Sequence, residues 1–446
     1  MPQIMRKIID PELIPPEVLE IAATLKEAGG EPYIVGGSIR DILLGKTPSD
    51  WDIAVDLHPE EVLAIFPDAL TIGIEFGRVS VGNVDVVSLR HEADYLDRRH
   101  PSKVRFGVPI EKDLERRDFT VNAMAWDPFS GEIFDPFDGY TDLSLRVLKS
   151  VGDPSVRFQE DPLRILRAIR FKDTIGFNLH PDVIKAMSES KDLLGQVAGE
   201  RLFVELKYIL LSPSVYQGIR DLYDYGLSNA VLPEINGDPE GIGIALSACS
   251  PNLVTRLGTL FGCEGMESTM EEIDDAVEEF KDRFNLAKWL AEDVKWLAAN
   301  SDPEGTVRYE TLPSRILNLF NREHLPWDDP EYAVRRIVYH WGRLRLEQLI
   351  EVKQALWRGR GKGGMPKGCL FLASGIDALG QDHLEEVENL RIALDGNDII
   401  QILNIRPSPV VGEALDYLEE IVLRDVRLND KETLSEILSE WWSKRR

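Results

Sequence analysis

Cysteine is scarce in this chain. Only Cys249, Cys263 and Cys369 occur among its 446 residues, and none belongs to a Cys-x-x-Cys pair. Such isolated thiols cannot form a disulfide framework and lack the spacing of a zinc site, so we expect a reducing compartment. No apolar run reaches the ~18 residues that a membrane-spanning helix needs, and no signal-peptide pattern opens the chain. We therefore expect a soluble, cytoplasmic protein without a membrane partner.

Basic residues are outnumbered by acidic ones. The chain has 51 Lys and Arg against 77 Asp and Glu, a net charge of −26. This balance argues against a protein that coats nucleic acid non-specifically, although a local basic groove is compatible with it. None of the seven histidines precedes an aspartate, so a common metal-phosphohydrolase signature is missing. The length predicts about two to four domains.

A glycine pair follows a short β-branched run near the start of the chain. Residues 33–41 read Tyr-Ile-Val-Gly-Gly-Ser-Ile-Arg-Asp. The glycines allow a tight turn with bare N–H groups, and Ser38 and Asp41 have the spacing of a capping box. A helix that begins here and ends at Gly45 would point its positive end at a ligand over Gly36 and Gly37. The pattern predicts a phosphate site.

Two aspartates follow in an alternating segment, Ser-Asp-Trp-Asp-Ile-Ala-Val. In a strand, Asp50 and Asp52 share one face, and Trp51, Ile53 and Val55 share the other. Close carboxylates repel one another unless a cation neutralises them, and their hard oxygens suit Mg²⁺. The alternative is a turn aspartate beside a solvent-facing one, but the glycine turn immediately upstream favours the metal site.

A third carboxylate interrupts the second of two strand-like runs, residues 78–81 and 84–89. Asp85 would complete the donor set of a two-metal site, or it could simply face solvent. The charged residues 90–105 that follow predict a loop, either a solvated connector or a mobile arm that touches substrate.

Basic residues then enter an apolar segment, residues 116–125. Asp118 and Asn122 lie four positions apart and would share a helix face, or they could be a cap and a polar surface residue.

Helical periodicity dominates from residue 160 onward. Residues 162, 165, 166 and 169 form an apolar face, which leaves Asp161, Arg164 and Arg167 on the other face. Asp161 could be only an N-cap and Arg164 its ordinary surface neighbour. The basic, glycine-rich residues 358–364 predict either a flexible linker, which we favour, or a phosphate-contacting loop.

Four of these motifs, in this order, resemble those of class II tRNA nucleotidyltransferases. They are Gly-Gly-Ser-Ile-Arg-Asp with Asp-Trp-Asp, Arg-Arg-Asp-Phe-Thr-Val-Asn-Ala-Met-Ala, Glu-Asp-Pro-Leu-Arg-Ile-Leu-Arg-Ala-Ile-Arg-Phe, and Glu-Arg at residues 200–201. The family comprises CCA-adding enzymes and bacterial poly(A) polymerases, and the match covers about half the chain. Residues 89–101 look like the full-length loop of bacterial CCA-adding enzymes. Asp138 departs from the pattern, since a glycine is usual there.

The resemblance implies a role for each motif. Two Mg²⁺ ions would bind Asp50, Asp52 and Asp85, the catalytic carboxylates. Gly36, Gly37, Ser38 and Arg40 would bind the triphosphate of CTP or ATP. Asp118 and Asn122 would bind the ribose, and Asp161 and Arg164 would select cytosine or adenine by hydrogen bonds. Supporting residues would be Arg117, Arg157, Arg167 and Arg170, and the flexible loop would contribute Arg90, Asp97, Arg98 and Arg99.

The resemblance also implies the architecture and the reaction. We expect an α/β, polymerase-beta-like nucleotidyltransferase head with a mixed sheet over residues 1–150. An all-α neck (151–215), body (216–345) and tail (346–446) would follow and bind the acceptor and T arms of tRNA. The protein would add C, C and A to tRNA as a monomer without an obligatory protein partner. The alternatives are an A-adding or CC-adding sibling, a bacterial poly(A) polymerase, and a non-catalytic RNA-binding protein on a decayed head.

Overall fold

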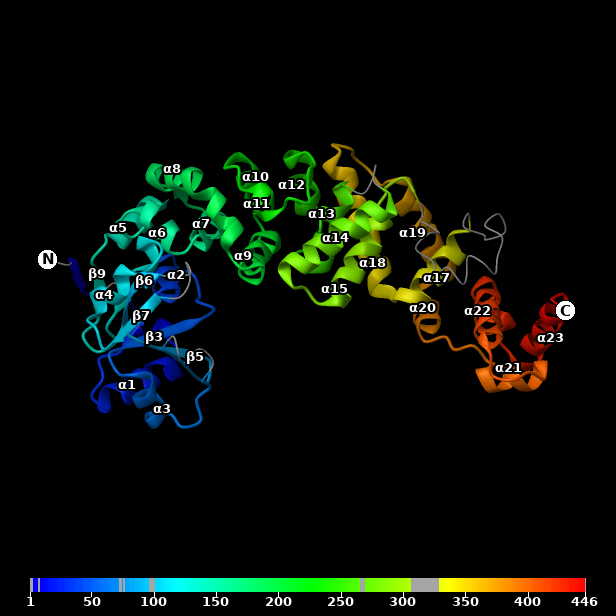
Figure 1. Ribbon diagram of the computed structural model, residues 1–446, viewed down its shortest axis with the longest axis horizontal. Helices are drawn as coiled ribbons and strands as arrows, with labels where there is room; N and C mark the ends of the chain where they lie inside the picture. Colours follow the sequence, from blue (N-terminus) through cyan, green and yellow to red (C-terminus); the bar gives the residue numbers. More distant parts are fainter. Residues whose placement is uncertain are drawn as a thin grey trace. The chain divides into compact units, whose positions relative to one another are not determined.

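The computed structural model describes residues 3–6, 9–71, 74, 77–95, 101–264, 269–305 and 329–445. The chain divides into two compact units (Figure 1). Unit 1 contains residues 1–209 and 221–231, and unit 2 contains residues 210–220 and 232–446. The finer division into head, neck, body and tail stays a prediction. In the described part of the chain, no helix is both long and apolar enough to cross a membrane.

Unit 1 is built on a mixed sheet, as predicted. In the described residues its strand order is β1-β9-β8-β2-β3-β5-β4; β3 and β5 are parallel, and the other neighbours are antiparallel. The strands are β1 (Gln3–Arg6), β2 (Tyr33–Val35), β3 (Trp51–Val55), β4 (Arg78–Val81), β5 (Val84–Ser88), β8 (Ala125–Trp126) and β9 (Glu132–Asp135). A short parallel pair, β10 (Val147–Leu148) and β11 (Asn178–Leu179), lies outside this sheet.

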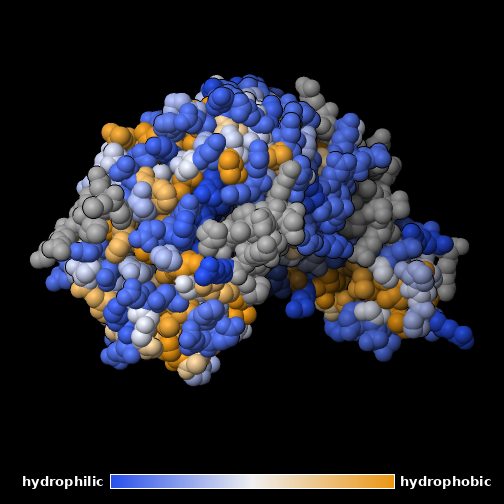
Figure 2. All heavy atoms as spheres, turned by 60° about the vertical axis from the view of Figure 1, so that its left-hand side comes forward, coloured by the Kyte–Doolittle hydropathy of each residue, from blue (hydrophilic) through white to orange (hydrophobic). Residues whose placement is uncertain are grey.

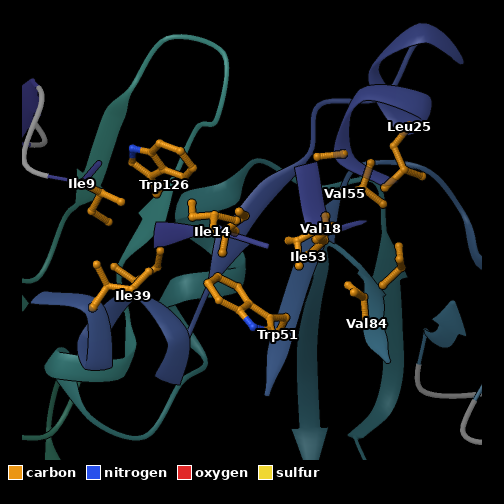
Figure 3. Close-up of a cluster of buried hydrophobic side chains, with 14 of the residues drawn as sticks. Ile9, Ile14, Val18, Leu25, Ile39, Trp51, Ile53, Val55, Val84 and Trp126 are labelled. Atoms are coloured by element: carbon orange, nitrogen blue, oxygen red, sulfur yellow. The ribbon is translucent and has the colours of Figure 1, made fainter. Parts of the chain in front are cut away.

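Apolar side chains cover both faces of the sheet. On one face Trp51, Ile53 and Val55 of β3 pack with helices α1 and α3, as the alternation predicts (Figure 3). On the other face Ala54 packs with residues of helix α4. The helices of unit 1 are α1 (Pro16–Glu27), α2 (Gly37–Leu43), α3 (Pro59–Ile65), α4 (Ile110–Glu115), α5 (Gly139–Leu145), α6 (Pro154–Glu160), α7 (Leu163–Ile175), α8 (Pro181–Ser190), α9 (Gly199–Leu211) and α11 (Ser228–Val231), with short 3-10 helices at Pro11–Leu13, Thr120–Asn122 and Lys191–Gln196.

The charged stretch after β5 is not a loop, which corrects the prediction. Strands β6 (Arg90–Tyr95) and β7 (Pro101–Phe106) pair antiparallel, from Arg90 opposite Phe106 to Tyr95 opposite Pro101. Antiparallel strands are joined by backbone hydrogen bonds, which form whatever the side-chain pattern, so a charged sequence does not exclude a hairpin. The predicted loop residues Asp97, Arg98 and Arg99 lie outside the described residues.

The departure at Asp138 has a simple backbone explanation. Asp138 has φ +58°, a left-handed conformation that glycine adopts readily and aspartate tolerates. The next residue cannot be replaced in the same way, because a Cβ on Gly139 would lie 2.2 Å from the carbonyl oxygen of Thr120. The Asp135 carboxylate accepts hydrogen bonds from the N–H groups of Gly139 and Tyr140. These bonds hold the backbone of the turn in place.

Unit 2 is helical in its described residues and contains two apolar cores. Its helices, with α10 shared between the units, are α10 (Val215–Asp224), α12 (Pro239–Ser247), α13 (Leu253–Glu264), α14 (Met270–Phe284), α15 (Lys288–Ala299), α17 (Pro330–Trp341), α18 (Arg343–Gly359), α19 (Lys367–Leu379), α20 (Gln381–Glu388), α21 (Gly396–Leu403), α22 (Pro409–Arg424) and α23 (Lys431–Ser443), with a 3-10 turn at Val426–Leu428. Figure 2 shows mainly hydrophilic side chains on the visible face, with scattered hydrophobic patches.

The glycine-rich residues 358–364 do not link separate cores. They connect α18 and α19, whose side chains share one core. The indole N–H of Trp357 donates to the carbonyl oxygen of Gly363 at 2.9 Å, and the Lys362 ammonium lies 4.3 Å from the centre of the same indole. The segment is therefore a folded turn, and contact with phosphate stays a prediction.

Candidate active site

A cleft of about 610 Å³ in unit 1 collects most of the predicted site residues. We call its two sides the sheet wall and the helix wall. The sheet wall contains Gly36, Gly37, Ser38, Arg40, Asp50 and Asp52, and the helix wall contains Arg116, Arg117, Asp118, Asn122, Asp161, Arg164, Arg167, Arg170, Phe171 and Arg201. The predicted residues Asp85, Arg90 and Arg157 do not line the cleft.

The glycine turn on the sheet wall requires glycine. Gly36 has φ +81°, where L-residues with a side chain are strained. A Cβ there would also lie 3.0 Å from Nη1 of Arg117 and 3.5 Å from Oδ2 of Asp52. The turn thus lets the backbone approach both a guanidinium and a carboxylate of the cleft.

The predicted capping box is wrong. Gly36 is the N-cap of α2, so Ser38 lies inside the first turn, and its hydroxyl donates to the carbonyl oxygen of Val35 at 3.1 Å. Asp41 instead accepts from Nε of Arg40 at 2.8 Å. Gly45, with φ +69°, follows the end of the helix as predicted.

Asp50 and Asp52 both line the cleft. Asp52 on β3 lies directly opposite Asp85 on β5. Burial raises the pKa of Asp52; the charge of Arg117 opposes this shift, and the neighbouring charges of Asp85 and Asp50 add to it. A partly buried carboxylate with two acidic neighbours is stabilised by a cation, so this pair fits a divalent ion with hard oxygen ligands.

Asp85 has protein partners of its own. Its carboxylate accepts from the Ser80 hydroxyl at 2.6 Å and pairs with Nη2 of Arg78 at 2.6 Å. Within the described ranges, no group of three or more His, Cys, Asp or Glu side chains is arranged to hold a metal ion. The fit is therefore to two carboxylates, and the role of Asp85 as a third ligand stays a prediction.

Asp118 is a buried carboxylate of the helix wall. Its carboxylate accepts from Nε and Nη2 of Arg167 at 2.8 and 2.6 Å, and from the side-chain amide of Asn122 at 3.1 Å. Burial alone would raise the pKa of Asp118, but the charge of Arg167 and these hydrogen bonds lower it to about 2. Asp118 and Asn122 do meet, although a 3-10 turn brings them together rather than the predicted helix face.

Asn122 also connects the two walls. Its side-chain oxygen accepts from Nη1 of Arg40 at 2.7 Å. The Arg40 guanidinium lies 5.2 Å from the centre of the Phe171 ring, and Arg167 and Arg170 lie 5.2 and 4.4 Å from the same ring. Sequence reasoning did not single out Phe171, although it ends the motif that contains Arg164.

The predicted base-reading residues are bound by other side chains and carbonyl groups in and around the cleft. Asp161 accepts from Nη2 of Arg201 at 2.8 Å. The Arg164 guanidinium donates to the Glu160 carboxylate and to the carbonyl oxygens of Arg157 and Arg116, at 2.8, 3.1 and 2.9 Å. These bonds use three of the five N–H donors of a guanidinium.

Arg157 lies behind the cleft. It donates to Glu160 and to the carbonyl oxygens of Val151 and Glu115. It therefore braces the residues that hold Arg164, which fits the supporting role predicted for it.

A buried carboxylate that sequence reasoning missed holds the two adjacent arginines. Asp113, 1% exposed, accepts from Nε and Nη2 of Arg116 at 2.9 and 2.6 Å and from Nη2 of Arg117 at 3.1 Å. Burial would raise the pKa of Asp113, but the two guanidinium charges lower it. The sequence spacing could have predicted these ion pairs, because the two arginines follow Asp113 by three and four positions.

Two family models match parts of the chain. One describes a poly A polymerase head domain and matches residues 32–149; the other describes a probable RNA and SrmB-binding site of polymerase A and matches residues 176–238. Both matches fall largely in unit 1.

Relatives extend the similarity to nearly the whole chain. CCA-adding enzymes of Streptococcus suis and Lactococcus lactis subsp. cremoris are 30% and 31% identical to it over 430 and 432 residues, covering 94% of this chain and 94% and 96% of their own. The crystal structure of the Bacillus stearothermophilus CCA-adding enzyme in complex with CTP is 26% identical with a TM-score of 0.70, covering 97% of this chain and 99% of that one. A Thermotoga maritima CCA-adding enzyme complexed with tRNA has the same fold, at 21% identity, a TM-score of 0.59, and coverage of 99% of this chain and 100% of its own.

Proposed function

This chain belongs to the family of CCA-adding enzymes, and we propose that it adds C, C and A to the 3′ end of tRNA from CTP and ATP, in the cytoplasm. The observation that carries the proposal is the gathering of all four sequence motifs at one cleft. The cleft offers carboxylates for a metal, a glycine turn for phosphates and several guanidinium groups.

The sheet wall would hold the reacting groups. Asp50 and Asp52 would bind Mg²⁺, with Asp85 as a further ligand if it leaves Arg78. When bound, the metal supplies Lewis-acid chemistry that favours deprotonation of the tRNA 3′-hydroxyl and neutralises charge on pyrophosphate. The glycine turn and Arg40 would hold the triphosphate, since bare N–H groups and a guanidinium both bind phosphate oxygens.

The helix wall would choose the nucleotide. Asp118 would accept from the ribose 2′-hydroxyl, and Arg167 would keep its carboxylate ionised for that bond. Asp161, oriented by Arg201, would accept from the exocyclic amine of cytosine or adenine, and Arg164 would donate to the ring acceptors. Uracil and guanine carry a carbonyl oxygen at that position and would leave Asp161 unsatisfied.

Sequencing of the products tests the proposal. The protein is incubated with CTP, ATP and Mg²⁺, and with tRNA transcripts that lack either the three terminal nucleotides or only the terminal A. We expect C, C and A on every extended transcript. Products that end after C-C would indicate a CC-adding enzyme, and extension only of transcripts that already end in C-C would indicate an A-adding enzyme. Long A tails would indicate a poly(A) polymerase. No extension of any transcript would indicate a non-catalytic protein.

A further inference from the structure

A strip of exposed apolar side chains begins at the edge of the cleft. Arg201 lines the cleft on α9, and Val204 and Tyr208 follow it by three and seven positions, which places the three on one helix face. Val204 is 52% exposed and Tyr208 is 55% exposed. The strip is continuous with the site, because it starts at a residue that pairs with Asp161.

The Tyr208 ring is tied to the cleft by a guanidinium group. The Arg170 guanidinium lies 4.9 Å from the centre of the Tyr208 ring and 4.4 Å from the centre of the Phe171 ring. Nε of Arg170 also pairs with the buried Glu205 carboxylate at 3.1 Å. These contacts hold one side of the Tyr208 ring while much of the side chain stays open to solvent.

We propose that Tyr208 and Val204 form a stacking platform for the 3′-terminal base of the tRNA acceptor strand. The inference rests on the proposed function and names where its second substrate binds. An aromatic ring stacks on any base with about 1–3 kcal/mol, because every base has a π-face. That tolerance suits an acceptor whose terminal base changes after each addition. The exposed Lys207 on the same helix supplies positive charge for the acceptor phosphates.

The incoming nucleotide and the acceptor base need different kinds of binding site. The incoming nucleotide must be identified, so it needs directional hydrogen bonds such as those of Asp161 and Arg164. The acceptor base must be held without being identified, and a ring with an adjacent hydrocarbon side chain does this.

Kinetics with separate substrates test the platform. The Tyr208→Ala variant should raise KM for tRNA lacking its terminal nucleotides by roughly 5- to 150-fold, with KM for CTP unchanged, and Tyr208→Trp should restore it. Phe129→Ala is the matched control, because Phe129 is an aromatic residue of unit 1 that is 51% exposed and lies outside the cleft lining. An unchanged KM for tRNA, or a raised KM for CTP instead, would overturn the proposal.

A spectroscopic measurement separates the platform from catalysis. A tRNA transcript that ends in 2-aminopurine should lose fluorescence on binding wild type and Tyr208→Trp, and keep it on binding Tyr208→Ala. Equal quenching by all three proteins refutes the platform even if wild type adds C, C and A. If wild type adds no nucleotide, the proposed function fails while the quenching still reports stacking. Self-association that Tyr208→Ala abolishes would instead assign the strip to a second copy of the chain.

Discussion

On the helix wall of the cleft, the carboxylates of Asp118 and Asp161 are each paired with an arginine, whereas the sheet-wall carboxylates of Asp50 and Asp52 lie on one site without an ion pair in the described residues. Asp118 accepts two hydrogen bonds from Arg167, and Asp113, which lies outside the cleft lining, accepts two from the helix-wall residue Arg116. Within the described part of the chain, no ion pair joins Asp50 or Asp52 to a basic residue. The helix wall is therefore organised before any ligand arrives, and the sheet wall is arranged for a positively charged ligand.

The largest effect should come from the sheet wall. Replacing Asp52 by Asn removes a proposed metal ligand, so nucleotide addition should fall by at least about 10³-fold, roughly 4 kcal/mol in transition-state stabilisation. The melting temperature should not fall, because the partly buried Asp52 carboxylate has acidic neighbours and its removal relieves repulsion. Turnover and thermal unfolding are measured on the same preparation. Turnover equal to wild type would refute the metal site.

Removing the carboxylate that binds two helix-wall arginines should instead cost stability. Asp113→Ala leaves Arg116 and Arg117 without their buried acceptor, and we expect a loss of roughly 3 kcal/mol in the free energy of unfolding. Denaturant unfolding measures it. Lys112→Ala on the same helix is the control, since its pair with Glu115 is solvent-exposed and contributes at most about 1 kcal/mol. Equal stability of the two variants would contradict the comparison.

Acid should weaken the helix wall through Asp118. Its pKa of about 2 in the folded protein lies below its ordinary value of 3.8, so the unfolded chain binds more protons between these values. The stabilisation is complete above about pH 4 and is lost as the pH falls through 2; the shift corresponds to about 2 kcal/mol. Unfolding is measured from pH 7 to pH 2 in wild type and Asp118→Asn. A pH dependence in the variant as steep as in wild type would refute this assignment.

Substitution at the edge of the helix wall should alter selectivity more than rate. Asp161→Asn keeps the shape of the side chain but removes its negative charge. The carboxylate that pairs with Arg201 and would accept a hydrogen bond from the base amine is then lost. Discrimination by kcat/KM for CTP over UTP should fall roughly 10-fold, about 1.4 kcal/mol. Competition assays with both nucleotides measure the ratio. Complete loss of turnover with selectivity unchanged would count against base reading.

The sequence predicted the cleft residues better than their partners. Alternation placed Trp51, Ile53 and Val55 in the core, and the motifs placed Asp118 and Asp161 at one site. Sequence could not show that Arg167, 49 positions away, binds Asp118, because such pairing depends on the path of α7 through space. It also missed the hairpin at residues 90–106, where backbone pairing rather than apolar periodicity determines the structure.

The smallest effect should come from Arg78, which pairs with Asp85. Arg78 is half exposed, so losing its ion pair in Arg78→Ala should change the free energy of unfolding by less than about 1 kcal/mol. If Asp85 is a metal ligand, its freed carboxylate should lower the Mg²⁺ concentration for half-maximal activity. The control is Arg427→Ala, which removes an exposed pair with Asp425 in unit 2 and should leave that concentration unchanged. An unaltered Mg²⁺ requirement in Arg78→Ala would show that Asp85 is not a metal ligand. Asp50 and Asp52 would then be the metal-binding pair, and Asp85 would only form an ion pair within the sheet.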